Sequence, residues 1–278
     1  MKKEILFGIV TYKEKFYECN SFLSLIESFE SVEDAELTIL VIDNTDVVNW
    51  SIDQNFVRKN IKIVYIHFPT NPGISFAYNK INAYADQNGF KWVIYLDQDT
   101  VLPLKSYLAY LNESNATSDP IKLPKVWAND KLLSPCWYMF HRSFWIKEIT
   151  EKNLSAKRIS CINSGIMINV NFFIEAGGYN ERLRIDLCDH EFISRAKKRI
   201  QNFYILDIDL VQDFSAHTNN LQQDLSRYKH FVRDIRAYSV NRSKLTIFFS
   251  LDLAHCLKLT YKHRSFEFIK QRFFIKIS

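Results

Sequence analysis

The chain has 278 residues, of which 47% are hydrophobic and 24% are charged, and it contains only six glycines and six prolines. This composition excludes long disordered or low-complexity tracts and predicts a globular chain with one main domain and an appendage, or two small domains. The net charge of +5 is uneven, because residues 225–278 contain 12 Lys and Arg against 3 Asp and Glu, while the rest contains 24 against 28. The basic character therefore belongs to the C-terminal tail.

Cysteine spacing and hydropathy exclude further classes. The five cysteines form no C-x-x-C pair, which argues against a zinc site or a disulfide framework and favours a reducing cytoplasm. The apolar run Ile5–Val10 is too short for a signal peptide, and no window has the roughly 20 apolar residues that a transmembrane helix needs. We therefore expect neither a secretory leader nor an integral membrane protein.

Short apolar runs rich in β-branched and aromatic residues alternate along the chain with longer segments of helical periodicity. We predict strands near residues 4–10, 37–42, 61–66, 92–97, 162–169 and 203–208. We predict helices near residues 18–30, 74–87, 104–112, 171–176, 190–199 and 221–238. This alternation is typical of an α/β fold with a mostly parallel central sheet flanked by helices.

Residues 114–160 show no clear periodicity. Pro120, Pro124 and Pro135 disfavour helices in this stretch. Six aromatic residues also crowd into it: Trp127, Trp137, Tyr138, Phe140, Phe144 and Trp145. We interpret the stretch as a loop that covers a substrate.

Polar residues follow four of the predicted strands. The first strand ends at Thr11 and Tyr12, the second at Asp43, and the third leads into the turn at residues 71–73. The fourth strand ends in Asp-Gln-Asp at residues 97–99. Because ligands of such sheets bind at the carboxyl ends of the strands, we expect these residues at one edge.

Each of these groups also has a purely structural interpretation. Asp97 and Asp99 supply the hard oxygen ligands that Mg²⁺ or Mn²⁺ prefers, or they form a polar turn. Asp43 would equally begin an Asx turn, and Gly73 would supply a positive φ before a helix. Spacing alone leaves both interpretations open.

The segment GGYNERLRIDLCDHEFISR at residues 177–195 places acids just before an amphipathic helix. Asp189 fits a helix N-cap, and Glu191 lies in the first turn, where negative charge suits the helix dipole. His217 follows the last predicted strand, and a single histidine is more often a surface side chain than a ligand.

The motifs follow one another in a set order. A strand ending in Thr-Tyr and a strand ending in Asp-Asn precede N-P-G-x-x-x-A-x-N, L-D-Q-D, N-S-G-I-M-I, G-G-Y-N-E-R-L-x-I-D-x-x-D-x-E-x-x-x-R and a histidine. Over about residues 4–242 this order resembles family 2 glycosyltransferases. More narrowly, LDQDT, the residues Asn163-Ser164-Gly165 and IDLCDHEFISR are similar to bacterial rhamnosyltransferases of that family.

The resemblance implies a GT-A fold and the inverting transfer of a sugar from a nucleotide diphosphate donor, with dTDP-rhamnose as the best candidate. It assigns the donor to Thr11, Tyr12, Asp43, Asn71, Gly73 and Asp97. It implies that Asp43 binds the base and that Asp97 approaches the ribose. It assigns a Mg²⁺ or Mn²⁺ ion to Asp99, with Asp97 and His217 as further contacts.

On the acceptor side, the resemblance makes Asp189 the general base and places Glu191 and Ser164 near the acceptor. The chemistry needs these residue types. An attacking sugar hydroxyl has a pKa far above 7, so a carboxylate must take its proton as the new bond forms. The departing nucleoside diphosphate gathers negative charge, which a divalent cation stabilises.

Two other classes remain as alternatives. A GT-A-fold nucleotide-sugar binding protein without catalysis would lack one of Asp43, Asp99 or Asp189, and all three are present. A sugar nucleotidyltransferase would carry a glycine-rich basic loop after the first strand, where this chain reads TYKEKFYE.

We divide the chain into a catalytic domain over residues 1–220 and a helical, basic, amphipathic region over residues 221–278. The tail favours contact with an anionic membrane surface, and helices packed on the core with a solvated basic face are the alternative. No nucleic-acid motif accompanies it, so we expect no nucleic-acid partner. We expect a cytoplasmic protein, peripheral at the inner face of the cell membrane, with a glycan or lipid-linked saccharide as acceptor.

Overall fold

The structure is a computed structural model that describes residues 3–30, 32, 35–48, 60–212 and 220–274. The first strands are β1 (Lys3–Thr11), β2 (Leu37–Asp43), β3 (Ile61–His67), β4 (Phe90–Asp97) and β5 (Thr100–Val101). They alternate with the 3₁₀ turn η1 (Phe16–Glu18) and the helices α1 (Asn20–Glu30), α2 (Ile74–Gln87) and α3 (Ser106–Glu113).

The later strands are β6 (Ile121–Ala128), β7 (Lys131–Ser134), β8 (Cys136–Met139), β9 (Arg142–Phe144), β10 (Asn153–Ser155), β11 (Ile159–Ser160), β12 (Met167–Asn169) and β13 (Asn202–Gln212). Among them lie the 3₁₀ turn η3 (Ala156–Arg158) and the helices α4 (Val170–Glu175) and α5 (Cys188–Ala196). The C-terminal helices are α6 (Leu221–Tyr238), α7 (Lys244–Ile247), the π-helical turn η5 (Phe248–Asp252), α8 (Leu253–His263) and α9 (Glu267–Phe273).

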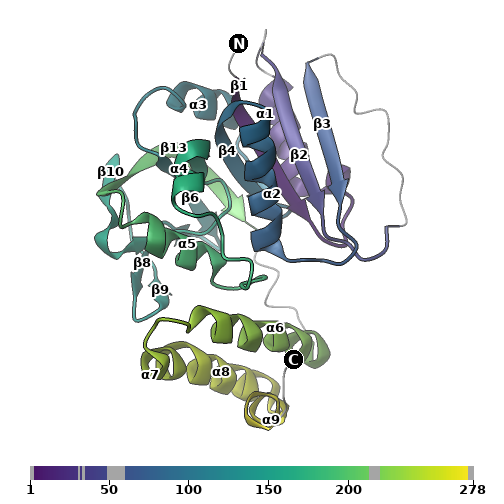
Figure 1. Ribbon diagram of the computed structural model, residues 1–278, viewed down its shortest axis with the longest axis vertical. Coiled ribbons are helices and arrows are strands. Elements are labelled where there is room, and N and C mark those ends of the chain that lie inside the picture. Colours follow the sequence, from purple (N-terminus) through teal and green to yellow (C-terminus); the bar gives the residue numbers. More distant parts are fainter. Residues whose placement is uncertain (1–2, 31, 33–34, 49–59, 213–219, 275–278) are drawn as a thin grey trace.

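The main sheet has the strand order β10-β13-β6-β12-β4-β1-β2-β3 (Figure 1). The strands β3, β2, β1 and β4 are parallel, β12 runs antiparallel to both of its neighbours, and β6 and β13 are parallel to each other. The register pairs Thr11 with Asp43 and Val10 with Asp97. Polar residues at the ends of β1, β2 and β4 therefore meet at one edge, and the predicted α/β class is confirmed.

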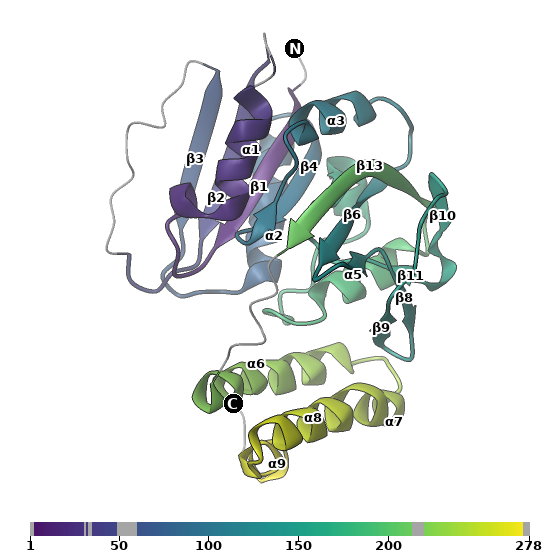
Figure 2. The same cartoon turned by 180° about the vertical axis from the view of Figure 1, so that it is seen from behind.

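Alternate residues of β1 face two separate cores. Phe7 and Ile9 pack on the side that α1 and α3 cover, as Figure 2 shows for α1. Leu6 packs on the opposite side, with α2. Gly8 lies directly under α2, and a Cβ atom there would come within 2.6 Å of the Cγ2 atom of Ile81. Glycine at this position therefore lets α2 approach the sheet closely.

The predicted loop over residues 114–160 is wrong. The strand β6 lies inside the main sheet, and β11, β8 and β9 form a second, three-stranded sheet. Pro124 sits within β6 opposite a break in the register of β13, between Ile205 and Asp209. A proline lacks the N–H that a regular ladder requires, and a register break removes that requirement locally.

The predicted strand over residues 162–169 is shorter in the structure, where only Met167–Asn169 is extended in the sheet. Asn163 and Ser164 enter a turn instead, and Gly165 in that turn has φ 76°. The other predicted strands and helices are present, with bounds that differ by a few residues.

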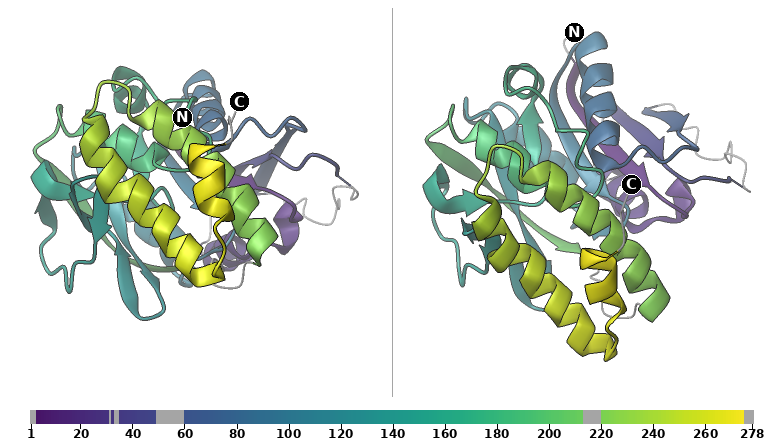
Figure 3. Two further views of the ribbon diagram at one scale, coloured as in Figure 1. Left: turned by 90° about the horizontal axis from the view of Figure 1, so that it is seen from below. Right: turned by 60° about the horizontal axis from the view of Figure 1, so that its bottom comes forward.

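The helix α6 lies between the sheet and the last helices (Figures 1 and 3). On the side of the sheet, the fully buried Asp234 accepts hydrogen bonds from the N–H groups of Ile185 and Asp186, both at 2.8 Å. On the other side, the ring of Tyr228 lies 5.6 Å from that of Phe268 in α9. Within the described ranges, no helix combines the length and the apolar character that crossing a membrane requires.

Candidate active site

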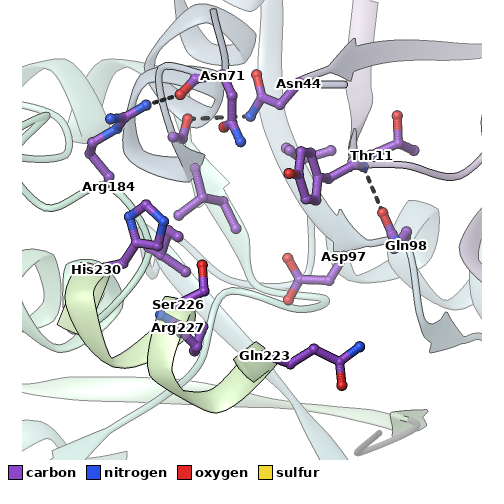
Figure 4. Close-up of a pocket in the computed structure, with 15 residues that line it drawn as sticks. Thr11, Asn44, Asn71, Asp97, Gln98, Arg184, Gln223, Ser226, Arg227 and His230 are labelled. Carbon is purple, nitrogen blue, oxygen red and sulfur yellow. Dashed lines mark hydrogen bonds between the residues drawn. The ribbon is translucent and has the colours of Figure 1, made fainter. Parts of the chain in front are cut away.

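A cavity of about 530 Å³ opens at the carboxyl edge of the sheet (Figure 4). Its walls come from the ends of β1 and β4, the segments that precede α2 and α5, and one face of α6. Five of the six predicted donor residues line it: Thr11, Tyr12, Asn71, Gly73 and Asp97. The structure therefore brings together residues that are up to 86 positions apart in the sequence.

The ends of β1 and β4 are joined by a hydrogen bond. The N–H of Tyr12 donates to Oε1 of Gln98 at 2.7 Å. Thr11 is fully buried at the end of the strand, whereas the ring of Tyr12 is exposed. An exposed aromatic ring at the cavity wall offers a surface on which a planar base can stack.

Asp43 lies beside the cavity, but its side chain does not line it. Its carboxylate is fully buried and accepts hydrogen bonds from the hydroxyl of Tyr65 at 2.6 Å and from the N–H of Thr45 at 2.9 Å. Burial, and secondly the bond to Asp43, raise the pKa of Tyr65. The next residue, Asn44, reaches the cavity instead, and the sequence interpretation did not assign it.

The turn before α2 is fastened to the segment before α5. Gly73 has φ 104°, and a Cβ atom there would come within 2.5 Å of the carbonyl oxygen of Arg184. The guanidinium of Arg184 donates to the carbonyl oxygens of Asn71 and Pro72, while the N–H of Ile74 donates back to the carbonyl of Arg184 at 2.6 Å. Arg184 lines the cavity, and sequence reasoning missed it.

Asp97 lines the cavity, and two hydroxyl groups hold its carboxylate in position. Its carboxylate accepts hydrogen bonds from the hydroxyl of Tyr78 at 2.6 Å and from the hydroxyl of Ser164. Burial raises the pKa of Asp97, these hydrogen bonds oppose the rise, and the negative charge of Asp189 adds to it. The buried Ser164 thus supports Asp97 and does not line the cavity.

Asp99 lies two residues further along the chain, where β5 pairs with β13. Nε2 of Gln212 donates to Oδ1 of Asp99 at 3.2 Å. Among the residues that the structure describes, Oε1 of Gln212 and Oγ1 of Thr100 are buried and have no hydrogen-bond partner. Carboxylate, amide and hydroxyl oxygens are the types of ligand that a hard divalent cation prefers.

No three His, Cys, Asp or Glu side chains of the described residues are grouped as metal ligands. Asp99 itself does not line the cavity, and its role as a metal ligand stays a prediction. The predicted contact His217 lies outside the described residues.

The helix α5 carries Asp189 and Glu191 in its first turn. The predicted N-cap role of Asp189 is wrong, because the N-cap is Leu187, in the left-handed conformation with φ 64°. Oδ1 of Asp189 accepts the N–H of His190 at 2.7 Å. Asp189 does not line the cavity, yet it lies near enough for its charge to act on Asp97.

Glu191 is buried in a network of ion pairs. Its carboxylate meets the guanidinium of Arg195 at 2.8 Å and that of Arg242 at 3.5 Å. It therefore ties α5 to the turn between α6 and α7. Sequence reasoning placed Glu191 near the acceptor, a role that stays a prediction.

One face of α6 forms the wall of the cavity opposite Asp97 (Figure 4). Its lining residues are Gln223, Ser226, Arg227 and His230. Arg227 makes a two-point ion pair with Asp186, at 2.5 and 2.6 Å. Burial, and then the charge of Arg233, lower the pKa of His230. The spacing of these four positions on one face of a helix is visible in the sequence, but the predicted domain boundary at residue 220 assigns α6 to the C-terminal region.

Residues 8–125 match the sequence profile of the family described as Glycosyl transferase family 2. No curated protein matches the chain.

Solved structures match the fold. TarS 1–349 of S. aureus in complex with UDP aligns with a TM-score of 0.54 and 14% identity, over 98% of this chain and 72% of that chain. The same protein in complex with UDP-GlcNAc aligns with a TM-score of 0.55 and 12% identity, over 84% and 66%. GalNAc-T7 with UDP, GalNAc and Mn²⁺ aligns with a TM-score of 0.55 and 14% identity, over 98% and 56%.

Residues 8–125 thus resemble family 2 glycosyltransferases, and the whole chain shares the GT-A fold of the solved glycosyltransferases. The predicted family resemblance and fold are thereby confirmed. Specificity for rhamnose stays a prediction.

Proposed function

We propose that the protein is a metal-dependent, inverting glycosyltransferase and that it binds the nucleoside diphosphate of its sugar donor in the cavity of about 530 Å³. The observation that carries this proposal is the distribution of charge. Asp97 lines one side of the cavity, and the cations Arg184 and Arg227 line the other, with His230 beside them (Figure 4). A diphosphate is attracted by such a wall, because oppositely charged groups attract strongly where water is partly excluded.

The proposed ion is Mg²⁺ or Mn²⁺, held by Asp99, and the side-chain oxygens of Thr100 and of Gln212, whose amide bonds to Asp99, are further candidate ligands. When bound, such an ion supplies Lewis-acid stabilisation of the departing diphosphate. Asp97 and His217 are the other proposed contacts of the ion. GalNAc-T7 was solved with UDP and Mn²⁺, which supports a divalent cation. Our proposed donor is dTDP-rhamnose, and UDP-sugars are the alternative because TarS was solved with UDP-GlcNAc.

Asp189 is the proposed general base. The hydroxyl oxygen of the acceptor attacks the anomeric carbon, the bond from that carbon to the diphosphate oxygen breaks, and the hydroxyl proton passes to the carboxylate of Asp189. A single displacement of this kind inverts the anomeric centre. The hydrogen bond from the N–H of His190 fixes the orientation of the carboxylate, which favours proton transfer along one direction.

The proposed acceptor is a glycan or lipid-linked saccharide at the inner face of the cell membrane. An apolar stripe on the C-terminal helices supports this location. It consists of Leu245, Phe249, Leu253, Leu257 and Tyr261, and four of these side chains are 70%, 59%, 51% and 88% exposed, Leu253 being the exception. The exposed Lys244, Lys258 and Arg264 flank the stripe, so that the surface suits an anionic lipid interface.

Calorimetric titration tests the donor site. UDP, dTDP and GDP are titrated into the protein with Mn²⁺ or Mg²⁺ and then with chelator. We expect at least one nucleotide to lose about tenfold or more in affinity without the ion, because the metal neutralises the diphosphate. Asp99→Ala should bind that nucleotide weakly and equally in both conditions, while Asp207→Ala, a change of an exposed acid on β13, should behave as the unmodified chain. Equal affinity of the unmodified chain with and without the ion would contradict the metal dependence.

A further inference from the structure

A second cavity, of about 310 Å³, lies beside the turn between β6 and β7. Its apolar lining consists of two tryptophans, Trp127 and Trp145, and the buried side chains of Leu132 and Ile146. Three charged residues complete the lining: Asp130, Lys131 and Lys147. We call this cavity the tryptophan pocket; none of its residues lines the donor cavity.

The indole of Trp127 is fixed by its own N–H group. That group donates to Oδ1 of Asp209 at 2.7 Å, and Nζ of Lys125 lies 3.4 Å from the same oxygen. The N–H of Trp127 is therefore satisfied within the fold, so that this residue offers the pocket its ring surface. An anchored ring loses little conformational freedom when a ligand packs against it.

The charged rim of the pocket is positioned by a tight turn. Asn129 and Asp130 have φ 48° and 58°, and Ala128 pairs with Lys131 across the two-residue turn. Such turns are typical of Asn and Asp, which tolerate positive φ. The Nζ atom of Lys131 lies 4.2 Å from the centre of the Trp145 ring, and Trp145 itself is 62% exposed.

The sheet register places Trp127 near the proposed metal site. Trp127 pairs with Val211 of β13, and Val211 pairs on its other side with Val101 of β5. Because neighbouring strands lie about 4.8 Å apart, the backbones of Trp127 and Val101 are about 10 Å apart. The residue after Val211 is Gln212, which donates to Asp99.

The other tryptophan lies close in the chain to the neighbourhood of the proposed base. Trp145 follows Ser143 by two residues, and the hydroxyl of Ser143 lies 3.0 Å from Nε2 of His190. His190 is the residue after Asp189. Trp127 is thus connected through the sheet to the proposed metal site, and Trp145 is connected through Ser143 and His190 to the proposed base.

We infer that the tryptophan pocket binds a saccharide unit of the acceptor, an inference that rests on the proposed function. A pyranose ring has apolar C–H faces that pack against indole rings, and hydroxyl groups that bond to carboxylates and ammonium groups. The pocket offers both kinds of contact, and three charged side chains disfavour a lipid chain as occupant. The bound unit is one that does not react, so that it positions the acceptor hydroxyl near Asp189.

Indole signals in an ¹H–¹⁵N NMR spectrum provide the test. The chain has five tryptophans, and the signal of Trp145 is assigned with a Trp145→Phe variant. The probes are tetrasaccharides of glucose, of N-acetylglucosamine and of rhamnose, each at about 10 mM, and UDP in a separate titration. The buried Trp92 serves as an internal control.

We expect at least one tetrasaccharide to shift the signals of Trp127 and Trp145 but not that of Trp92. Trp145→Ala should weaken its binding about fivefold or more, as expected for the loss of a packed aromatic ring. Leu104→Ala removes a side chain with the same exposure of 62% outside the pocket and should change nothing. The inference is wrong if no tetrasaccharide shifts these signals, if Trp145→Ala binds as well as the unmodified chain, or if UDP alone produces the shifts.

Failure of the proposed function gives a different result. A chain that binds none of the nucleotides in the calorimetric test, yet binds a tetrasaccharide at Trp145, would contradict the donor site and retain the saccharide pocket.

Discussion

Asp189 is held by the backbone of its own helix, through the N–H of His190. Asp189→Asn preserves the size of the side chain and an oxygen that accepts this N–H. The amide cannot take up the hydroxyl proton, so we expect turnover to fall about 10²- to 10⁴-fold. The donor dissociation constant and the melting temperature should change little. Turnover is measured with the donor whose nucleotide binds best in the calorimetric test.

Asp207→Asn is the matched control, because it makes the same change at an exposed position on β13. Near-normal turnover of Asp189→Asn, with an unchanged melting temperature, would show that Asp189 is not the base. Asp186 would then be the next candidate, although its ion pair with Arg227 gives it a structural role already.

Single residues could be predicted where a strand end positions them. Thr11, Tyr12 and Asp97 follow strands directly, and the strands themselves were recognisable from their apolar runs. Arg184 could not be predicted, because its partners are the backbone oxygens of a turn more than 110 positions away. Asp43 was recognised, but the hydroxyl of Tyr65 that covers it follows only from the packing of neighbouring strands.

At the scale of elements, the apolar stripe on α7, η5 and α8 has a spacing of four residues. In a regular α-helix, residues four positions apart differ in direction by about 40° around the helix axis, so such a stripe would gradually wind around the helix. The π-helical turn η5 has more residues per turn and offsets part of that drift. The stripe therefore stays on one side of the helical segment over residues 244–263.

We expect Phe249→Ser combined with Leu257→Ser to weaken binding to anionic vesicles about tenfold or more, because two exposed apolar side chains would no longer enter the interface. The measurement is flotation with vesicles that contain 30% anionic lipid, compared with neutral vesicles, where the unmodified chain should bind less well. Leu23→Ser combined with Leu104→Ser removes two exposed apolar side chains elsewhere and should float normally. Equal flotation of both double variants would exclude the stripe as a membrane surface. If the unmodified chain forms a concentration-dependent dimer and the stripe variant does not, the stripe instead contacts a second copy of the chain.

Elements were predictable where the apolar pattern was regular and were missed where it was broken. The strand β6 contains Pro124, a residue that disfavours regular secondary structure and so predicts a loop. Whether a strand tolerates proline depends on its neighbour, and the register break that accommodates Pro124 belongs to β13. The second sheet could not be recognised for a related reason, since its strands have only two to four residues.

At the scale of the whole molecule, His255 of α8 lies at the contact between α8 and α6. Its ring lies 4.4 Å from that of Phe231 and 5.8 Å from that of Tyr228. Burial, and then the charges of Lys258 and Arg227, lower the pKa of His255 to about 4, while Asp224 and Asp252 oppose this shift. The unfolded chain therefore takes up a proton at a higher pH than the folded chain, whose pKa lies below the ordinary value of 6.5.

Stability should consequently fall as the pH drops from about 6.5 toward 4, and recover as the pH rises again. Between pH 7 and pH 5 the free energy of unfolding should decrease in the unmodified chain. The decrease in His255→Gln should be smaller by about 2 kcal/mol. Urea unfolding at both pH values measures the difference. An identical loss in the two proteins would show that His255 does not contribute to the acid sensitivity.

The helix α6 takes part both in the donor cavity and in the packing of the C-terminal helices. One face of this helix lines the donor cavity, and the other packs against α8 and α9. If a nucleotide on the inner face stabilises the packing of the outer helices, thermodynamic reciprocity requires that a lipid surface which stabilises the same packing raises the affinity for the nucleotide by the same factor. A membrane would then act as an effector of donor binding as well as an anchor, and the protein would be most active where its acceptor is embedded.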